Sequence, residues 1–224
     1  MMRIFDIDGP IYRMMLTLTN MLVLSFCWII GTVIGLGLTV GVSTVAAFDV
    51  GLKMVENKEG YVARQFIKAY KKNLKQGIPL GLMAAVAFYT VYLDFELFHK
   101  IENASIFLLI WGFLSGAIFF CAFVYAFALS ARYVNTLKNT ISNSFRIATR
   151  YAGRTVLLAI VLAILACAFI WNLTLMFIGL IIGPAAYILT ISMFARPIFR
   201  NIEKKNTEDG IEYYDDPNED KDTI

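Results

Sequence analysis

Four long stretches of the chain contain no charged residue and no histidine, and short charged segments separate them. They cover residues 14–48, 76–93, 103–131 and 155–195. About 20 apolar residues cross a bilayer as a helix. The second stretch is therefore marginal for one crossing, the third is ample for one, and the first and fourth are each long enough for two. The pattern predicts an all-α, polytopic transmembrane helix bundle with five or six spans.

A cluster of glycines divides the first stretch, which predicts a helix over 14–35, a turn, and a shorter helix over 41–56. The shorter helix carries Asp49 and Lys53 near its end, so only a short part of it is apolar. It is either a sixth span or a re-entrant helix. The number of spans depends on this segment.

The fourth stretch is interrupted by Asn172, which predicts helices over 155–171 and 175–194. Pro184 lies inside the second of these helices. A proline is tolerated there when a neighbouring group satisfies the backbone that the proline leaves without a hydrogen bond. We therefore expect a helical hairpin with a kinked second helix.

Composition agrees with a membrane protein, because 58% of the residues are apolar and 17% are charged. A soluble core of a 224-residue chain could not bury this share of apolar residues. The N-terminal segment has no basic region, and the apolar stretch after it is too long for a signal peptide. We expect the segment to remain part of the protein.

Basic residues near the ends of the spans predict the orientation, because lysine and arginine are held on the cytoplasmic side. Segments 49–77 and 132–154 are rich in these residues, and so is the segment that follows the last span. Segment 94–102 is acidic and the turn at Asn172 is uncharged, so both are expected outside. The C-terminus is then cytoplasmic in a bacterial plasma membrane, and the N-terminus is inside with six spans and outside with five.

Two basic segments have the pattern of amphipathic helices. In segment 61–77, the apolar side lies opposite a basic side formed by Arg64, Lys68, Lys71, Lys72 and Lys75. Segment 141–154 repeats the design, with a basic side formed by Arg146, Arg150 and Arg154. We expect both helices to lie at the membrane surface with their charges toward anionic lipid. Topology explains these charges, so nucleic acid is not an expected partner.

The two amphipathic segments also align with each other. The pattern Phe66-x-x-Ala69-x-Lys71 matches Phe145-x-x-Ala148-x-Arg150, and the hairpins that follow end in Ala131-Arg132 and Ala195-Arg196. A weak internal repeat is predicted around 61–132 and 141–196, within a membrane domain over 1–200. Segment 206–224 has many acids and few apolar residues, and is expected to be a disordered cytoplasmic tail.

Few residues could carry chemistry at membrane depth. Asp49 is the one ionisable candidate for a substrate or ion pathway, with Asn20 and Asn172 as polar companions. Asp49 could instead lie near the cytoplasmic interface and pair with Lys53 four residues later. His99 lies in a short outer loop without a convincing set of metal ligands. The common catalytic and nucleotide-binding motifs do not occur, so no enzyme activity, cofactor or metal is expected.

Glycine pairs spaced four residues apart indicate close packing of helices, because small residues let two backbones approach in lipid. The glycines predicted to pack are Gly31, Gly35, Gly37, Gly41, Gly112, Gly116, Gly179 and Gly183. They fit a compact bundle or a subunit interface. The oligomeric state stays open.

One run of residues resembles a known family. The run comprises Thr39-Val-Gly-Val-Ser-Thr-Val-Ala-Ala-Phe48, then Glu59-Gly-Tyr61, Phe66 and Lys72-Asn-Leu-Lys-Gln76. It is similar to the YesL-like bacterial membrane proteins, a domain of unknown function numbered 624, over about residues 1–200. The family usually has proline where this chain has Val42. The resemblance implies a neighbourhood of genes for oligosaccharide uptake and implies no catalytic or binding residues.

Three functions remain open. The resemblance favours an accessory or regulatory subunit of an oligosaccharide uptake system, with a sugar transporter permease as its partner. A small carrier or channel would use Asp49 and the glycine-rich break before it. A lipid-sensing membrane scaffold would use the two basic amphipathic helices.

Overall fold

The structure is a computed structural model that describes residues 10–58, 60–100 and 106–208. The described residues form helices joined by short turns, and the helices are α1 (Pro10–Ile34), α2 (Val40–Val55), α3 (Val62–Lys72), α4 (Leu74–Lys100), α5 (Ile106–Phe123), α6 (Ala126–Arg132), α7 (Leu137–Arg150), α8 (Ala152–Ile170) and α9 (Leu173–Glu208). No strand occurs among these residues, so the predicted all-α fold is confirmed. Most of the predicted acidic tail lies outside the described residues.

Five helical segments of the described chain are long and apolar enough to cross a membrane. They are Tyr12–Ile34, Leu74–Lys100, Ile106–Arg132, Ala152–Ile170 and Leu173–Lys204. Helix α2 has 16 residues, which extend about 24 Å, whereas the hydrocarbon core of a bilayer is about 30 Å thick. Helix α2 is therefore too short to cross the membrane, and the number of candidate spans is five, not six.

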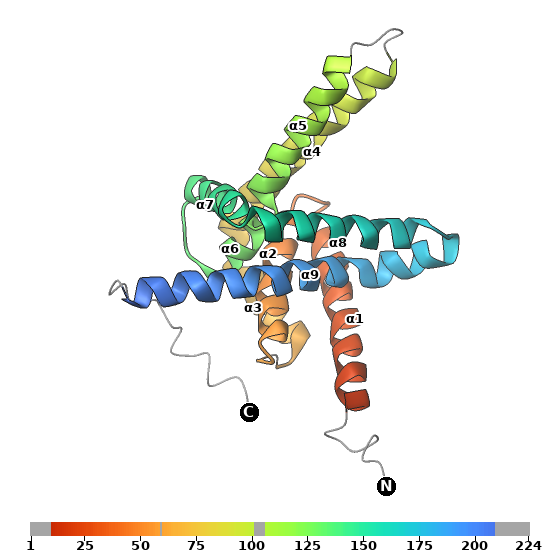
Figure 1. The fold of residues 1–224 in the computed structure, drawn as a ribbon. Coiled ribbons are helices and arrows are strands. Elements are labelled where there is room, and N and C mark those ends of the chain that lie inside the picture. Colours follow the sequence, from red (N-terminus) through yellow and green to blue (C-terminus); the bar gives the residue numbers. More distant parts are fainter. Residues whose placement is uncertain (1–9, 59, 101–105, 209–224) are drawn as a thin grey trace.

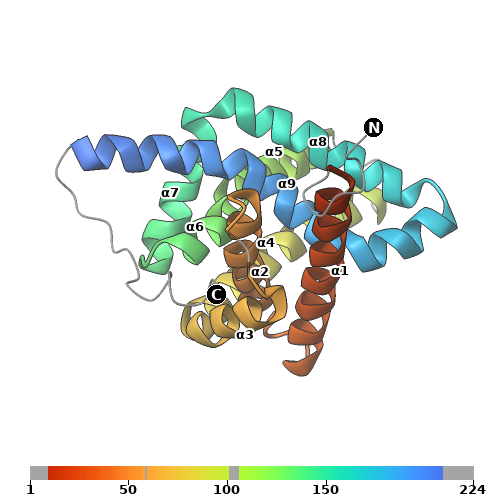
Figure 2. The same cartoon turned by 90° about the horizontal axis from the view of Figure 1, so that it is seen from below.

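The helices form a hub from which three arms diverge, as Figure 1 shows. The hub contains α2, α3, α6, α7 and the C-terminal half of α9. The arms are α1, the α4–α5 hairpin, and the hairpin of α8 with the first half of α9. In the view from below, α1 crosses α9 and the α8–α9 hairpin extends away from the hub (Figure 2). The N-terminal end of α1, the C-terminal end of α4, the start of α5 and the turn between α8 and α9 lie at the ends of the arms, away from the hub.

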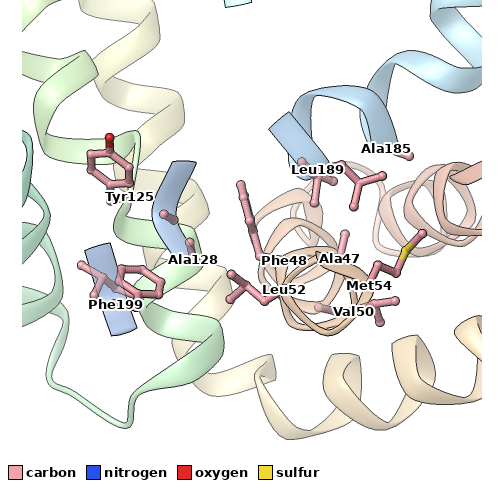
Figure 3. Packing of buried hydrophobic residues seen from close by; sticks show 14 of the residues in the cluster. Ala47, Phe48, Val50, Leu52, Met54, Tyr125, Ala128, Ala185, Leu189 and Phe199 are labelled. Carbon is pink, nitrogen blue, oxygen red and sulfur yellow. The ribbon is translucent and has the colours of Figure 1, made fainter. Parts of the chain in front are cut away.

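Helix α2 lies at the centre of the hub and is largely buried. It packs against α1, α3, α4, α6 and α9. Its buried positions are Gly41, Val42, Ser43, Val45, Ala46, Ala47, Phe48, Val50, Gly51, Leu52 and Met54. Figure 3 shows α2 side chains between Ala185 and Leu189 of α9 on one side and Ala128 of α6 on the other. The many glycines and alanines leave room for neighbours all around the helix.

The turn between α1 and α2 needs the glycine-rich sequence predicted there. Gly37 has φ of +84° and Leu36 has φ of +50°, both in the left-handed region that favours glycine. The Thr39 hydroxyl donates to the Gly31 carbonyl at 2.8 Å, and the Trp28 indole donates to Thr44 Oγ1 at 3.1 Å. These bonds hold α2 against the end of α1.

Helix α9 continues through Pro184, as the sequence required, with help from Ser25 of α1. The Ala185 amide donates to Ser25 Oγ at 3.1 Å, and that hydroxyl donates to the Ile182 carbonyl at 3.4 Å. Ser25 is fully buried. Pro184 has no N–H and so removes one hydrogen bond from the helix. The Ser25 side chain of α1 supplies hydrogen bonds to the backbone next to this position.

The stretch predicted as one helix over 103–131 is interrupted between α5 and α6, which the sequence did not predict. The Tyr125 amide donates to Ser144 Oγ of α7, and that hydroxyl donates to the Cys121 carbonyl, both at 3.3 Å. In a regular helix the Tyr125 amide would bond this carbonyl directly. Insertion of a side chain into the helix hydrogen bonds is a known cause of a break.

Candidate functional site

Asp49 lies on α2, and its carboxylate is 3.3 Å from the ammonium of Lys53 one turn later. The side chains are 24% and 29% exposed, respectively. This is the i,i+4 pair that the sequence offered as the alternative to a transport role. The pair places the Asp49 carboxylate near the charged end of α2.

The other two residues of the predicted pathway are not brought to Asp49. Asn20 lies on α1, half-buried, and Asn172 lies in the turn between α8 and α9, at the end of an arm. Asn172 is exposed, and its side-chain oxygen accepts from the Thr174 amide at 3.1 Å, which caps the start of α9. The three residues therefore occupy three different parts of the molecule.

A charged cluster that the sequence did not predict forms at the end of α2. Glu56 directly follows α2, and its side chain is 14% exposed. Its Oε1 accepts from the guanidinium groups of Arg132 at the end of α6 and Arg196 of α9, each at 3.3 Å. Lys58 lies 3.9 Å from the other carboxylate oxygen. One carboxylate thus joins the ends of α2 and α6 to the C-terminal half of α9.

Glu203 of α9 extends this cluster. Arg132 forms two parallel hydrogen bonds with the Glu203 carboxylate, at 2.7 Å from Nε and 3.3 Å from the second nitrogen. The Tyr133 hydroxyl donates to the same carboxylate at 2.7 Å. Two-point pairing fixes the orientation of both groups as well as their distance. We call Glu56, Arg132, Tyr133, Arg196 and Glu203 the charged cluster.

Arg132 and Arg196 are the arginines that end the two hairpins of the predicted repeat. In the sequence they are interpreted as basic residues that mark the cytoplasmic side and as the matching last residues of the two hairpins. The structure brings both onto one oxygen of Glu56. The shared Ala-Arg endings were visible in the sequence, but their common partner lies 76 and 140 positions away along the chain. The repeat itself stays a prediction.

The charged cluster has the chemistry of a structural lock. Its acids are paired with arginines, and Arg196 also donates to the Val55 carbonyl at the end of α2 at 3.3 Å. Among the residues that the structure describes, no group of three or more His, Cys, Asp or Glu side chains could hold a metal ion. The arrangement fixes the ends of α2 and α6 relative to the C-terminal half of α9.

Predicted packing glycines lie at two close contacts of the hub. A Cβ added to Gly41 of α2 would overlap the Gly77 carbonyl oxygen of α4 and would lie 2.5 Å from the Gly81 Cα. A Cβ on Gly31 of α1 would lie 2.8 Å from Ser43 Oγ of α2. The backbones of α2 and α4 therefore touch where they cross, and only glycine fits.

In the arms, the predicted glycines face the partner helix of each hairpin. A Cβ on Gly179 would lie 2.6 Å from the Phe169 ring of α8, and one on Gly183 would lie 3.6 Å from the same ring. In the α4–α5 arm, a Cβ added to Gly112 would lie 3.4 Å from the Asp94 Cβ, and one added to Gly116 would lie 3.7 Å from the Val91 side chain. These contacts are inside the hairpins.

The sequence predicts that Gly35 and Gly37 pack helices together. Among the residues that it describes, the structure gives Gly37 no such contact, and it gives Gly35 a contact only within its own turn. Within the described part of the chain, nothing lies within 4 Å of a Cβ added to Gly37, whose positive φ explains the glycine instead. A Cβ on Gly35 would overlap the Thr39 side chain of the same turn. Both glycines shape the turn between α1 and α2 and do not join helices across the bundle.

The predicted basic residues are exposed on their helices. On α3 and the first turn of α4 they are Arg64, Lys68, Lys71, Lys72 and Lys75, and beside α7 and α8 they are Arg146, Arg150 and Arg154. The apolar sides are only partly buried. Val62, Phe66 and Ala69 of α3 pack into the hub, whereas Ile67 is 54% exposed.

Comparison with known proteins identifies the N-terminal part of the chain. A family model described as "Protein of unknown function, DUF624" matches residues 21–95. This segment covers most of α1, all of α2 and α3, and most of α4. No curated protein and no solved structure matches the chain. The narrower YesL-like name is compatible with the match. The resemblance seen in the sequence is thus confirmed over residues 21–95, and this part of the membrane protein is similar to the DUF624 family.

Proposed function

We propose that the protein is an accessory or regulatory subunit of a bacterial plasma membrane, linked to an oligosaccharide uptake system, and that it does no chemistry itself. The observation that carries the proposal is the apolar surface of the arms. In the best windows of the five candidate spans, only 11–22% of the residues are buried. Such helices need lipid or another membrane protein around them.

The α4–α5 arm offers the clearest surface for a partner helix. Phe88, Phe107 and Trp111 are 76%, 77% and 61% exposed, respectively. Large aromatic side chains are enriched where membrane and soluble proteins bind partners, because they bury much area at low entropic cost. A permease is the partner that the gene neighbourhood implied by the resemblance favours.

The positions of the polar groups favour this role over that of a carrier. A carrier needs polar groups that converge near the middle of the membrane. Asp49 pairs with Lys53, Asn172 caps α9 at the end of an arm, and Asn20 lies on a third helix. These three residues do not form a common path.

The proposed orientation places the hub at the cytoplasmic side of the membrane and the ends of the arms outside. With five spans and a cytoplasmic C-terminus, the N-terminus is outside. This orientation requires the start of α1, the C-terminal end of α4 and the turn between α8 and α9 to lie away from the hub, as they do in Figure 1. The basic helices α3 and α7 belong to the hub.

A photo-crosslinking experiment tests the proposed partner. A photoreactive amino acid replaces Phe88. The cells are grown on oligosaccharides, and their native membranes are irradiated. We expect an adduct with a transporter permease. The same label at Leu158, which is fully buried, is the control and should give no such adduct.

Reconstitution tests the carrier alternative. The purified protein in liposomes should take up no oligosaccharide. Uptake by the protein alone, abolished by Asp49→Asn without loss of folded protein, would overturn the accessory role.

A further inference from the structure

Helix α3 is attached to the hub by one narrow side. Val62, Phe66, Ala69 and Asn73 are buried, and the Tyr70 hydroxyl donates to the Gly31 carbonyl of α1 at 3.1 Å. With 3.6 residues per turn, these positions fall on one side of the helix. The rest of the surface of α3 is left for other contacts.

Beside the buried side runs a strip of exposed apolar residues. It consists of Ala63, Ile67 and Leu74, with Ile67 54% and Leu74 37% exposed. On a helical wheel of segment 61–77 these residues and Phe66 fall on the same apolar side, opposite the basic side. The structure divides that side into a part that the hub covers and a part that it does not.

The next sector of the helix is basic. Arg64, Lys68, Lys71, Lys72 and Lys75 are exposed there, and residues 62–76 contain no acid. Three of these cations fall within five positions. Helix α3 therefore presents an apolar strip and a dense row of positive charge side by side.

The chain holds this surface next to the membrane. Only Asn73 separates α3 from α4, and Leu74 begins a candidate span. Lys71, Lys72 and Lys75 thus lie within three residues of the start of that span. The headgroups of anionic lipids carry negative charge at this level of the membrane.

We propose that this surface of α3 binds anionic phospholipid, with Ile67 and Leu74 in the acyl boundary and Lys71, Lys72 and Lys75 on the headgroup phosphates. The proposal goes beyond the accessory role and rests on the position of the hub at the cytoplasmic side of the membrane. Charge complementarity and attachment to a span favour lipid over an acidic protein. An apolar strip beside lysines is the arrangement of helices that lie in the interface.

The test measures binding of phosphatidylglycerol to the purified full-length protein in a neutral detergent. The melting temperature is followed while the lipid is added, and phosphatidylcholine is added in a parallel titration. We expect phosphatidylglycerol to raise the melting temperature at much lower concentration than phosphatidylcholine. In Lys71→Gln/Lys72→Gln/Lys75→Gln, the apparent Kd for phosphatidylglycerol should rise about a hundredfold.

Two variants separate charge on α3 from net charge and from misfolding. Lys138→Gln/Arg200→Gln/Lys204→Gln removes three exposed cations from α7 and α9 and should keep the wild-type Kd. Lys71→Arg/Lys72→Arg/Lys75→Arg should also keep it. Without lipid, all variants should melt as the wild type does.

Three outcomes would overturn the proposal. They are an unchanged Kd in the α3 glutamine variant, an equal loss in the α7 and α9 variant, and an equal shift with glycerol 1-phosphate, which lacks acyl chains. A purified acidic protein that displaced the lipid with higher affinity would point to that class of partner instead. None of these results depends on a permease, so the accessory role is tested separately.

Discussion

Helix α2 and the α8–α9 arm differ in how their sequences relate to their surroundings. The arm comes from the longest stretch of the chain without a charged residue, yet in α8 only Thr155 and Leu158 are buried. Helix α2 has 16 residues, two of them charged, and most of its side chains are covered by protein. In a soluble protein the more apolar helix would be the more buried one.

The difference shows what determines burial when lipid is the alternative environment. Lipid is as apolar as leucine, so apolarity does not drive one helix against another. Close approach does, and Gly41, Ala46, Ala47 and Gly51 allow it on several sides of α2. Small residues mark the hub, and large apolar residues mark the arms.

Closing the space at the α2–α4 crossing should have the largest effect. In Gly41→Leu the side chain meets the backbone of Gly77 and Gly81, which cannot rotate away. We expect destabilisation by at least about 3 kcal/mol and loss of folded protein from membranes. Size-exclusion chromatography and thermal melting in detergent measure this. Gly153→Leu on α8, where nothing lies within 4 Å among the described residues, should fold normally. Equal behaviour of the two variants would contradict the distinction between hub and arm.

Two phenylalanines on one helix provide the next test. Phe199 lies in the hub half of α9, 1% exposed and packed edge-on against Tyr133, whereas Phe177 lies in the arm half and is 58% exposed. Phe199→Ala should destabilise by about 3 kcal/mol, because it leaves a cavity. Phe177→Ala should change the melting temperature little, because lipid fills the space. A larger effect at Phe177 would show that the arm packs against protein.

Neutralising one carboxylate should have a smaller effect. Glu56→Gln removes the charge that Arg132 and Arg196 share and should destabilise by about 2 kcal/mol, less than for a fully buried pair, since the arginines are about a third exposed. Thermal melting measures it. Glu96→Gln breaks the exposed pair with Lys100 in the α4–α5 arm and should leave the melting temperature unchanged. If the two variants melt alike, the charged cluster is not a lock.

The regular parts of the fold could be predicted from the sequence, because they depend on local patterns. The break before α2, the hairpin turn at Asn172 and the basic helices follow from glycine, asparagine and the spacing of lysines. The break at Tyr125 could not be predicted, because its cause is Ser144 on another helix. The same holds for Glu56, whose partners come from two distant hairpins. The predicted pathway groups Asn20 and Asn172 with Asp49, but the three residues lie apart in the structure. Which distant side chains come together depends on the folded chain, so the sequence alone could not test this grouping.

The crossing of α2 and α4 also has a consequence for the order of biosynthesis. Gly41, Gly77 and Gly81 all lie within the first 81 residues, whereas the α9 side chains that cover the other side of α2, Ala185 and Leu189, are translated more than 100 residues later. A ribosome that has completed α4 has therefore produced both halves of the tightest contact of the hub. Until the last quarter of the chain follows, one side of α2 has no partner from its own polypeptide. From Gly81 to Ala185, 104 of the 224 residues are thus synthesised while the centre of the hub is only partly covered.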